Sequence, residues 1–141
     1  SSEWKERLDF LPPENIRQIS IRNSIGIFSS QRMAKFIREK NIEIVHAHVA
    51  RDYFPASLAC RIAKTPKFVL TRHVLFPMKT FHRFALNNLS KAIAVSKGVE
   101  PQLRALFPKE KITVISNGVE VKSLSATEKN ALREAFRFEH N

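Results

Sequence analysis

The residues of this sequence that could do chemistry stand where short apolar runs end. Histidine, arginine, hydroxyl and amide side chains can hold a phosphate or a hydroxyl group by hydrogen bonds, and histidine also exchanges a proton near neutral pH. Two histidines in alternate positions of a strand point to the same side of it. We therefore treat as one candidate site the polar residues that end four successive runs: His46 and His48, then Thr71-Arg72-His73, then Ser96, and finally Ser116-Asn117-Gly118.

A metal ion is one alternative for the three histidines. Zinc takes three or four ligands, and His46, His48 and His73 would supply three. A metal-binding imidazole also needs a group that orients it, and Asp52 is the only acid nearby in the sequence. We therefore expect no metal here. For His46 we favour a hydrogen bond to a loop carbonyl, whereas for His73 a phosphate or hydroxyl contact and a structural role both stay open.

Neither a nucleophile nor a phosphate-binding loop is indicated. Ser96 and Ser116 lack the G-x-S-x-G surroundings of a nucleophile elbow, so we interpret both as strand-end caps. Cys60, the single cysteine, stands in an apolar helical stripe, which favours a buried, unreactive thiol and suits a reducing cytoplasm. The three glycines cannot make a G-x-G-x-x-G or P-loop cradle, and we expect no cofactor.

The positive charge is concentrated in the middle of the chain. Lysine and arginine number 24 against 13 acidic residues, which gives a formal net charge of +11. Residues 49–111 hold 12 basic and 3 acidic residues and so carry +9 of it. Such a field attracts the phosphates of nucleic acid, of anionic lipid or of a phosphorylated substrate, and charge alone does not choose among them. A basic surface that only keeps the domain soluble is the other interpretation.

The elements that must position these residues alternate along the chain. Segments with helical spacing separate the apolar runs, which predicts right-handed βαβ crossovers and a parallel sheet. At 141 residues the chain has the length of one such domain. The four buried strands that we expect are Ile42–His48, Phe68–Val74, Ala92–Ser96 and Ile112–Ser116, with the alternating run Ile16–Ile21 as a candidate edge strand.

The expected helices share an apolar stripe with a period near 3.6 residues. Ser29–Lys40 begins at Ser29 or Ser30 as its N-cap. The last helix begins with Ser125-Ala-Thr-Glu128, a capping box in which each side chain satisfies a free backbone N–H group. The stripes are Met33, Phe36 and Ile37; Leu58, Ala59, Ile62 and Ala63 within Asp52–Lys64; Phe81, Phe84, Ala85 and Leu89; Val99, Leu103, Leu106 and Phe107; and Leu132, Ala135 and Phe136.

The segment Phe76–Phe84 combines aromatic and basic residues. Phe81 and Phe84 share one face of the expected helix, and Lys79 and Arg83 lie off that face. Aromatic side chains beside cations suit a nucleic acid or the surface of a membrane. A helix that packs its phenylalanines inward and leaves its cations in water is the alternative, and both interpretations stay open.

The motifs occur in an order that resembles the family 4 (group 1) glycosyltransferases. That family has the GT-B fold, in which two Rossmann-like domains face each other across a cleft. The resemblance implies that the N-terminal domain binds the acceptor and the C-terminal domain a nucleotide-sugar, with retention of the anomeric configuration and without a bound metal. It rests on four motifs at matching separations: Ile44-Val-His-Ala-His48, Thr71-Arg-His73, Ile93-Ala-Val-Ser96 and Ile112-Thr-Val-Ile-Ser-Asn-Gly-Val119.

On this resemblance, residues 1–141 are a single partial domain, most of the N-terminal half of a GT-B fold. We expect a three-layer α/β/α arrangement with a mainly parallel sheet, whose residues 122–141 form a helix leading toward a C-terminal donor domain. The family's first strand and Gly-rich loop would lie before Ser1, and its donor-binding Arg/Lys pair and E-x7-E carboxylates after Asn141. The chain by itself would then bind an acceptor weakly and transfer nothing.

The resemblance also implies roles for individual residues. His73 matches the histidine of the family's T-x-H motif in the cleft, and its implied role is a hydrogen bond to sugar or phosphate oxygens that strengthens in the transition state. His48 matches the second histidine of the V-H-x-H motif, on the acceptor side. Thr71 belongs to the same substrate-binding group, and Arg72, where the family commonly has an apolar or small residue, suits an anionic acceptor. Asn117 completes the expected substrate-binding group, as a residue that fixes the loop before the interdomain hinge.

The leading hypothesis is the acceptor domain of a cytoplasmic sugar transferase that builds a lipid-linked, lipopolysaccharide or other cell-envelope glycan. Family members with lipid acceptors dock on anionic membranes through a basic, aromatic face, which Lys79, Phe81 and Arg83 suit, so we expect a peripheral place at the inner face of the cytoplasmic membrane. Two alternatives stay open: a sugar-nucleotide 2-epimerase of the same fold, and a stand-alone basic α/β module that binds nucleic acid. The ordered motifs fit the epimerase less well, and nucleic acid is not the expected partner.

Overall fold

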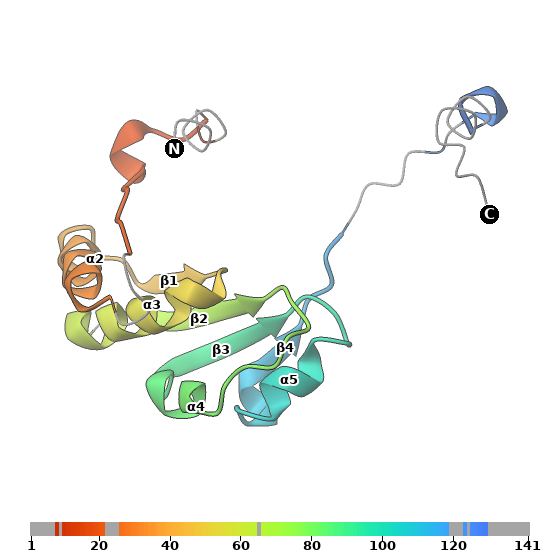
Figure 1. The fold of residues 1–141 in the computed structure, drawn as a ribbon. Coiled ribbons are helices and arrows are strands. Elements are labelled where there is room, and N and C mark those ends of the chain that lie inside the picture. The colour runs from red at the N-terminus through yellow and green to blue at the C-terminus, as the bar shows by residue number, and fades with distance from the viewer. Residues whose placement is uncertain are drawn as a thin grey trace.

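A computed structural model describes residues 8, 10–21, 26–64, 66–118, 123 and 125–129 of the chain. At its centre lies a four-stranded parallel sheet with the strands in the order β1-β2-β3-β4 (Figure 1). The predicted α/β class and its parallel, Rossmann-like arrangement are thereby confirmed. The elements are η1 Pro13–Asn15, α2 Ile27–Glu39, β1 Ile44–Ala47, α3 Ala50–Ala63, β2 Lys67–Arg72, α4 Phe81–Ala85, β3 Leu89–Ala94, α5 Glu100–Arg104, η2 Lys109–Lys111 and β4 Ile112–Val114.

The helices that connect the strands lie on one face of the sheet (Figure 1). Because the strand order is sequential and every pair is parallel, right-handed crossovers bring α3, α4 and α5 to the same side. Alternate strand residues such as Phe68, Leu70 and Ala92 are buried against these helices. On the opposite face, Ile44 and Ile115 are 59% and 54% exposed. The described residues therefore show two of the three expected layers, the sheet and the helices on one of its faces. Their strands follow one another in sequence order across the sheet.

Two clusters of buried side chains hold the layers together. The larger one lies between the sheet and helices α3 and α5, and each large side chain that it buries contributes about 1.5–3 kcal/mol. In the smaller one, Ala34 and Ile37 of α2 meet Ala59 and Ala63 of α3. The three alanines let the two helices approach closely, so α2 is held by α3 rather than by the strands.

Helix α2 begins earlier than predicted, at Gly26. The backbone of Gly26 is left-handed, with φ of 46°, and no side chain caps the helix. The predicted N-caps Ser29 and Ser30 are wrong, because both hydroxyls face carbonyl oxygens instead of N–H groups. Ser29 Oγ donates to the Ser20 carbonyl at 2.7 Å, and Ser30 Oγ lies 2.9 Å from the carbonyl of Gly26 and 3.0 Å from that of Pro55.

Helix α4 is only five residues long, and of the predicted helices it departs most from its predicted length. Leu89, placed in its apolar stripe, instead begins β3. Helix α5 is equally short, and its N-cap is Val99. The described segment Ile16–Ile21 contains no strand, so the predicted edge strand is wrong. In each case the sequence pattern is local, whereas the element is limited by what it can pack against.

The capping box at the start of the last helix is confirmed. The Ser125 N–H group donates to Glu128 Oε2 at 2.8 Å, and the Glu128 N–H group donates to Ser125 Oγ at 3.3 Å. The expected apolar stripe of this helix lies outside the described residues, and so does the predicted passage to a second domain.

Candidate functional site

Four polar side chains meet at the ends of β1 and β2, on the face of the sheet that no described helix covers. His46 pairs with Val69 in the register, so Thr71 lies one row further along the same face. His46 Nε2 lies 2.7 Å from Thr71 Oγ1. The ring centroids of His46 and His48 are 4.1 Å apart, and those of His48 and His73 are 5.6 Å apart. The prediction that His46 and His48 point the same way is confirmed.

The rings of His48 and His73 contact each other through their nitrogens. His48 Nδ1 lies 3.3 Å from His73 Nε2. An N–H···N hydrogen bond needs one donor and one acceptor, so one ring presents an N–H group to the other at this contact. Both residues are exposed, and a ligand oxygen can therefore replace the contact and take a hydrogen bond from either ring.

His46 differs from the other two in its electrostatics. Burial, and then the nearby His48 and His73, lower the pKa of His46 below its usual 6.5. A neutral ring can either accept the proton of the Thr71 hydroxyl or donate to its oxygen. The loop carbonyl that we expected as its partner is therefore wrong, because the register places a hydroxyl of the neighbouring strand there. His46 thus fixes Thr71, and its ring lies against that of His48.

A cavity of about 500 Å³ opens beside these histidines. Its walls come from the end of β1, the start of α3, and the end of β2 with the loop that follows. This is the edge of the sheet formed by the carboxyl ends of the strands, where open α/β sheets hold their ligands. The residues that line it include His48, Val49, Ala50, Tyr53, Arg72 and His73.

Arg72 turns its side chain to the helical side of the sheet and is only 4% exposed. Its Nη2 donates to the carbonyl of Phe76, while its Nε is buried without a hydrogen-bond partner in the described part of the chain. Tyr53, which is 1% exposed, donates from its hydroxyl to the carbonyl of Thr71 at 2.6 Å. Burial raises the pKa of Tyr53, and the charge of Arg72 together with a side-chain hydrogen bond between the two residues opposes that rise.

The structure gathers most of the predicted site residues but not all of them. Asn117 is exposed at the far side of the sheet, beyond β4, where its N–H group donates to the carbonyl of Val95 at 3.3 Å. Sequence reasoning missed Tyr53, although it is the single tyrosine and follows the second histidine by little more than one helical turn. The residues that meet are His46, His48, Thr71, Arg72 and His73.

An exposed aromatic–basic patch lies on and before α4. We give this name to Phe76, Lys79, Phe81, Arg83 and Phe84, all of them exposed. Phe76 and Phe84 are 77% and 76% exposed, so the alternative in which these phenylalanines pack inward is wrong. The ring centroids of Phe81 and of Phe54 in α3 are 5.9 Å apart. Helix α4 therefore belongs to the helical layer and does not lie on the face of the sheet that carries the histidines.

Metal and thiol chemistry find no support in the described part of the chain. Within those residues no three His, Cys, Asp or Glu side chains are placed to hold a metal ion. Cys60 is buried, and burial raises the pKa of its thiol to about 11, as expected of an unreactive cysteine.

No helix in the described ranges has both the length and the apolar character needed to cross a bilayer.

Comparison with known proteins identifies a matching family and a similar solved structure. Residues 5–123 match the family described as Glycosyltransferase Family 4. The fold is similar to the crystal structure of a glycosyltransferase from Rickettsia africae ESF-5, with a TM-score of 0.65 and 24% sequence identity. The similarity covers 94% of this chain but only 38% of that one. No curated protein matches the chain significantly.

Proposed function

The chain belongs to glycosyltransferase family 4, and we propose that it forms the acceptor-binding part of an enzyme that transfers a sugar from a nucleotide-sugar to a glycan or lipid-linked acceptor. The observation that carries this proposal is the pair of exposed histidines beside a cavity at the carboxyl ends of β1 and β2. Because the chain spans only 38% of the length of the solved glycosyltransferase, the donor is assigned to a part of the enzyme outside residues 1–141.

His73 is the candidate catalytic residue. It is exposed at the cavity, and its Nε2 bonds only the ring of His48 among the described residues. When a sugar or phosphate oxygen replaces that contact, His73 can donate a hydrogen bond that strengthens as negative charge develops on the leaving group. His48 faces the acceptor, while His46 and Thr71 hold the two exposed rings in place.

The test is sugar transfer by the complete enzyme with a panel of nucleotide-sugars. We expect His73→Ala to lower kcat about 10²- to 10³-fold at saturating donor, the usual cost of losing one hydrogen bond that forms in the transition state. His82→Ala is the matched control, because its ring contacts the carbonyl of Lys79 at 2.9 Å and lies outside the cavity. Turnover that is unchanged in His73→Ala would remove His73 from the site, and a wild-type enzyme that transfers no sugar would overturn the function itself. The anomeric proton of the product, observed by NMR, tests whether configuration is retained.

The aromatic–basic patch supports a second part of the proposal, docking on the inner face of the cytoplasmic membrane. Phenylalanine rings can enter the interfacial region while Lys79 and Arg83 attract anionic headgroups. The chain places three such rings, Phe76, Phe81 and Phe84, within nine residues of one another. The net charge of +9 over residues 49–111 favours the same surface.

Vesicle sedimentation tests this docking. Joint replacement Phe76→Ser and Phe84→Ser should weaken binding to anionic vesicles about 10-fold or more, because each ring contributes about 1.5–3 kcal/mol when buried. Phe28→Ser on α2 is the matched control, since Phe28 is 81% exposed but lies outside the patch. Added salt should weaken binding by the wild type. Equal loss in the control variant, or tighter binding to duplex DNA than to vesicles, would contradict membrane docking.

A further inference from the structure

We propose that Arg72 and the first turn of α3 form a binding site for a phosphoryl group of the acceptor. This inference rests on the proposed function for the identity of the ligand, since it takes the occupant to be the acceptor. The site itself is argued from three independent features of the chain: a buried arginine with no acidic partner, an uncapped helix start, and a cavity that both of them line.

The buried guanidinium of Arg72 is the main observation. Burying a cation is costly unless an anion or several hydrogen bonds compensate for the lost water. Arg72 is 4% exposed, yet no carboxylate among the described residues lies within ion-pair distance of it. One nitrogen donates to the Phe76 carbonyl, the side chain also hydrogen-bonds with Tyr53, and Nε is buried without a partner in that part of the chain. The guanidinium therefore keeps one unused N–H group, which a phosphate reaches only after a small shift of the side chains that cover it, and arginine is the side chain best suited to phosphate oxygens.

The start of α3 supplies a second source of positive potential. The first N–H groups of a helix have no partner within it, and the aligned peptide dipoles favour an anion there. Helix α3 has 14 residues, and its N-cap Val49 offers no side-chain hydrogen bond. Val49 is itself 55% exposed, so a ligand can reach this turn from solvent.

The cavity brings the two features together. Val49 and Ala50 of the helix start line the same space of about 500 Å³ as Arg72, with His48 and His73 at its rim. Apolar neighbours strengthen the attraction between a guanidinium and a phosphate, because they exclude water from the contact.

One acid lies close to the site. Asp52 is in the first turn of α3 but does not line the cavity, and Arg51 Nε lies 3.7 Å from its Oδ1. Asp52 Oδ1 is also buried without a hydrogen-bond partner in the described part of the chain, so its charge opposes an anion at this turn and the exposed Arg51 offsets only part of it.

The alternative is a purely structural Arg72 that only holds the loop after β2 through the Phe76 carbonyl. The two roles are separated by titrating the complete protein with inorganic phosphate, at constant ionic strength maintained with chloride. In the wild type, the backbone amide signals of Val49 and Ala50 should shift on phosphate addition. Arg72→Gln should weaken phosphate binding about 10- to 100-fold, the range for a hydrogen bond to a charged group.

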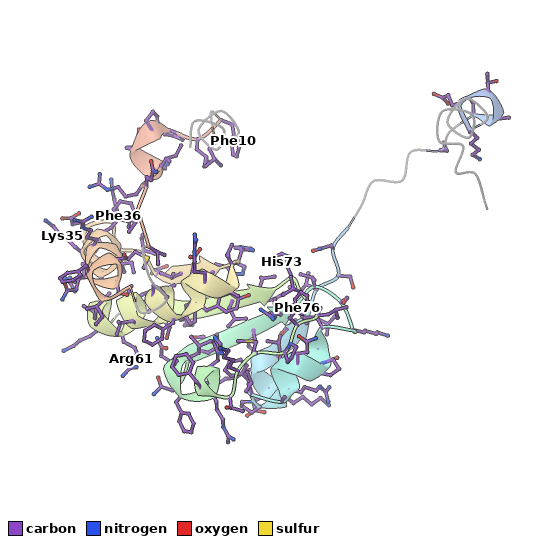
Figure 2. All side chains as sticks on the ribbon, in the orientation of Figure 1. Phe10, Lys35, Phe36, Arg61, His73 and Phe76 are labelled. Atoms are coloured by element: carbon purple, nitrogen blue, oxygen red, sulfur yellow. The ribbon has the colours of Figure 1, made fainter. Side chains whose placement is uncertain are left out.

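Two further variants sharpen the result. Arg61→Gln removes the same charge from the exposed far end of α3, away from His73 in Figure 2, and should bind phosphate within about twofold of wild type. Arg72→Lys keeps a positive charge and should recover part of the affinity, which shows that a folding defect does not explain the loss. Phosphate binding that is unchanged in Arg72→Gln, or amide signals of the helix start that do not move in the wild type, would overturn the proposal.

The source of the phosphoryl group is tested with two probes. Glycerol phosphate represents a soluble ester, and vesicles containing phosphatidic acid represent a lipid headgroup. If the wild type binds either probe and Arg72→Gln does not, the site is supported. If the wild type and Arg72→Gln bind both probes equally well, the site is overturned. Arg72-dependent phosphate binding without any sugar transfer would refute the proposed function alone, and sugar transfer with Arg72-independent phosphate binding would refute this inference alone.

Discussion

The hydrogen bond between the Tyr53 hydroxyl and the Thr71 carbonyl joins α3 to the end of β2, next to the candidate site. The bond is 2.6 Å long, and Tyr53 is 1% exposed. Tyr53→Phe removes the hydroxyl and keeps the ring, so it opens no large cavity. A buried hydrogen bond contributes about 0.5–1.5 kcal/mol net, and an acceptor left unpaired raises the cost toward about 3 kcal/mol. We therefore expect the free energy of unfolding to fall by about 1–2 kcal/mol.

Urea unfolding of the complete protein measures this change. With a denaturant slope of about 2 kcal/mol per molar urea, the midpoint should fall by about 0.5–1 M. Hydrogen exchange of a peptide covering residues 68–73 should become faster, because the lost bond lies at that strand end. Thr113→Val is the control, since it removes an exposed hydroxyl with no hydrogen bond among the described residues and should change stability by less than about 0.5 kcal/mol. A Tyr53→Phe protein as stable as wild type would refute the reasoning, and so would a loss above about 3 kcal/mol, which only a cavity would explain.

Three predictions concern titrating groups. Burial and the neighbouring histidines lower the pKa of His46, so its contribution to stability is present above pH 6.5 and is lost as the pH falls through the lowered value. In an NMR titration, His73→Gln should raise the pKa of His46, and an unchanged pKa would show that the histidines do not interact. Burial raises the pKa of Cys60 from 9.0 to about 11, so its contribution to the stability of the fold is present below pH 9.0 and is lost as the pH rises toward 11. Ellman's reagent should react with the thiol only after unfolding, and fast reaction of the native protein would contradict this. Hydrogen bonds from the side chain and backbone of Ser125 lower the pKa of Glu128, so the NMR signal of the Ser125 amide should titrate at that lowered pKa. Glu128→Gln should abolish this titration, and a titration that persists in the variant would show that another group causes it.

The two proposed sites use different faces of the same short domain. The exposed histidines lie on the open face of the sheet, and the rings of α4 belong to the helical layer. Arg72 lies between these regions, because it leaves β2 on the helical side while its neighbour His73 lies on the histidine side. An acceptor held by its phosphoryl group at Arg72 would therefore reach the histidines with its sugar-accepting end, and the membrane patch need not be released.

Features that depend on local spacing were predictable from the sequence. The alternation of strands and helices follows from apolar periodicity, and it correctly predicted four parallel strands. The capping box at Ser125, the buried thiol of Cys60, and the common direction of His46 and His48 also depend on residues close together in the chain. Each of these needs only the geometry of one element, which the sequence specifies directly.

Features that depend on packing partners were not predictable in the same way. Phe81 and Phe84 have the spacing of a buried helical face, yet they are exposed because α4 ends after five residues and Leu89 begins the next strand. The serines at the start of α2 resemble N-caps, yet Gly26 supplies the left-handed turn that the entering chain requires. Local propensity favours a helix or a strand in a segment, and the packing partners around that segment limit where the helix or strand begins and ends.

The sequence by itself determined the α/β class, the family-like order of motifs, and the presence of polar residues at the strand ends, because all of these follow from residue types and their spacing. Only the tertiary structure decided which of those residues meet. The register of β1 with β2 places Thr71 against His46, and the crossover brings the start of α3 to the same cavity as Arg72. Tyr53 and the unpartnered Nε of Arg72 acquire their significance from contacts between β2 and segments distant in sequence. Such contacts arise from the packing of layers, and no spacing along one element encodes them.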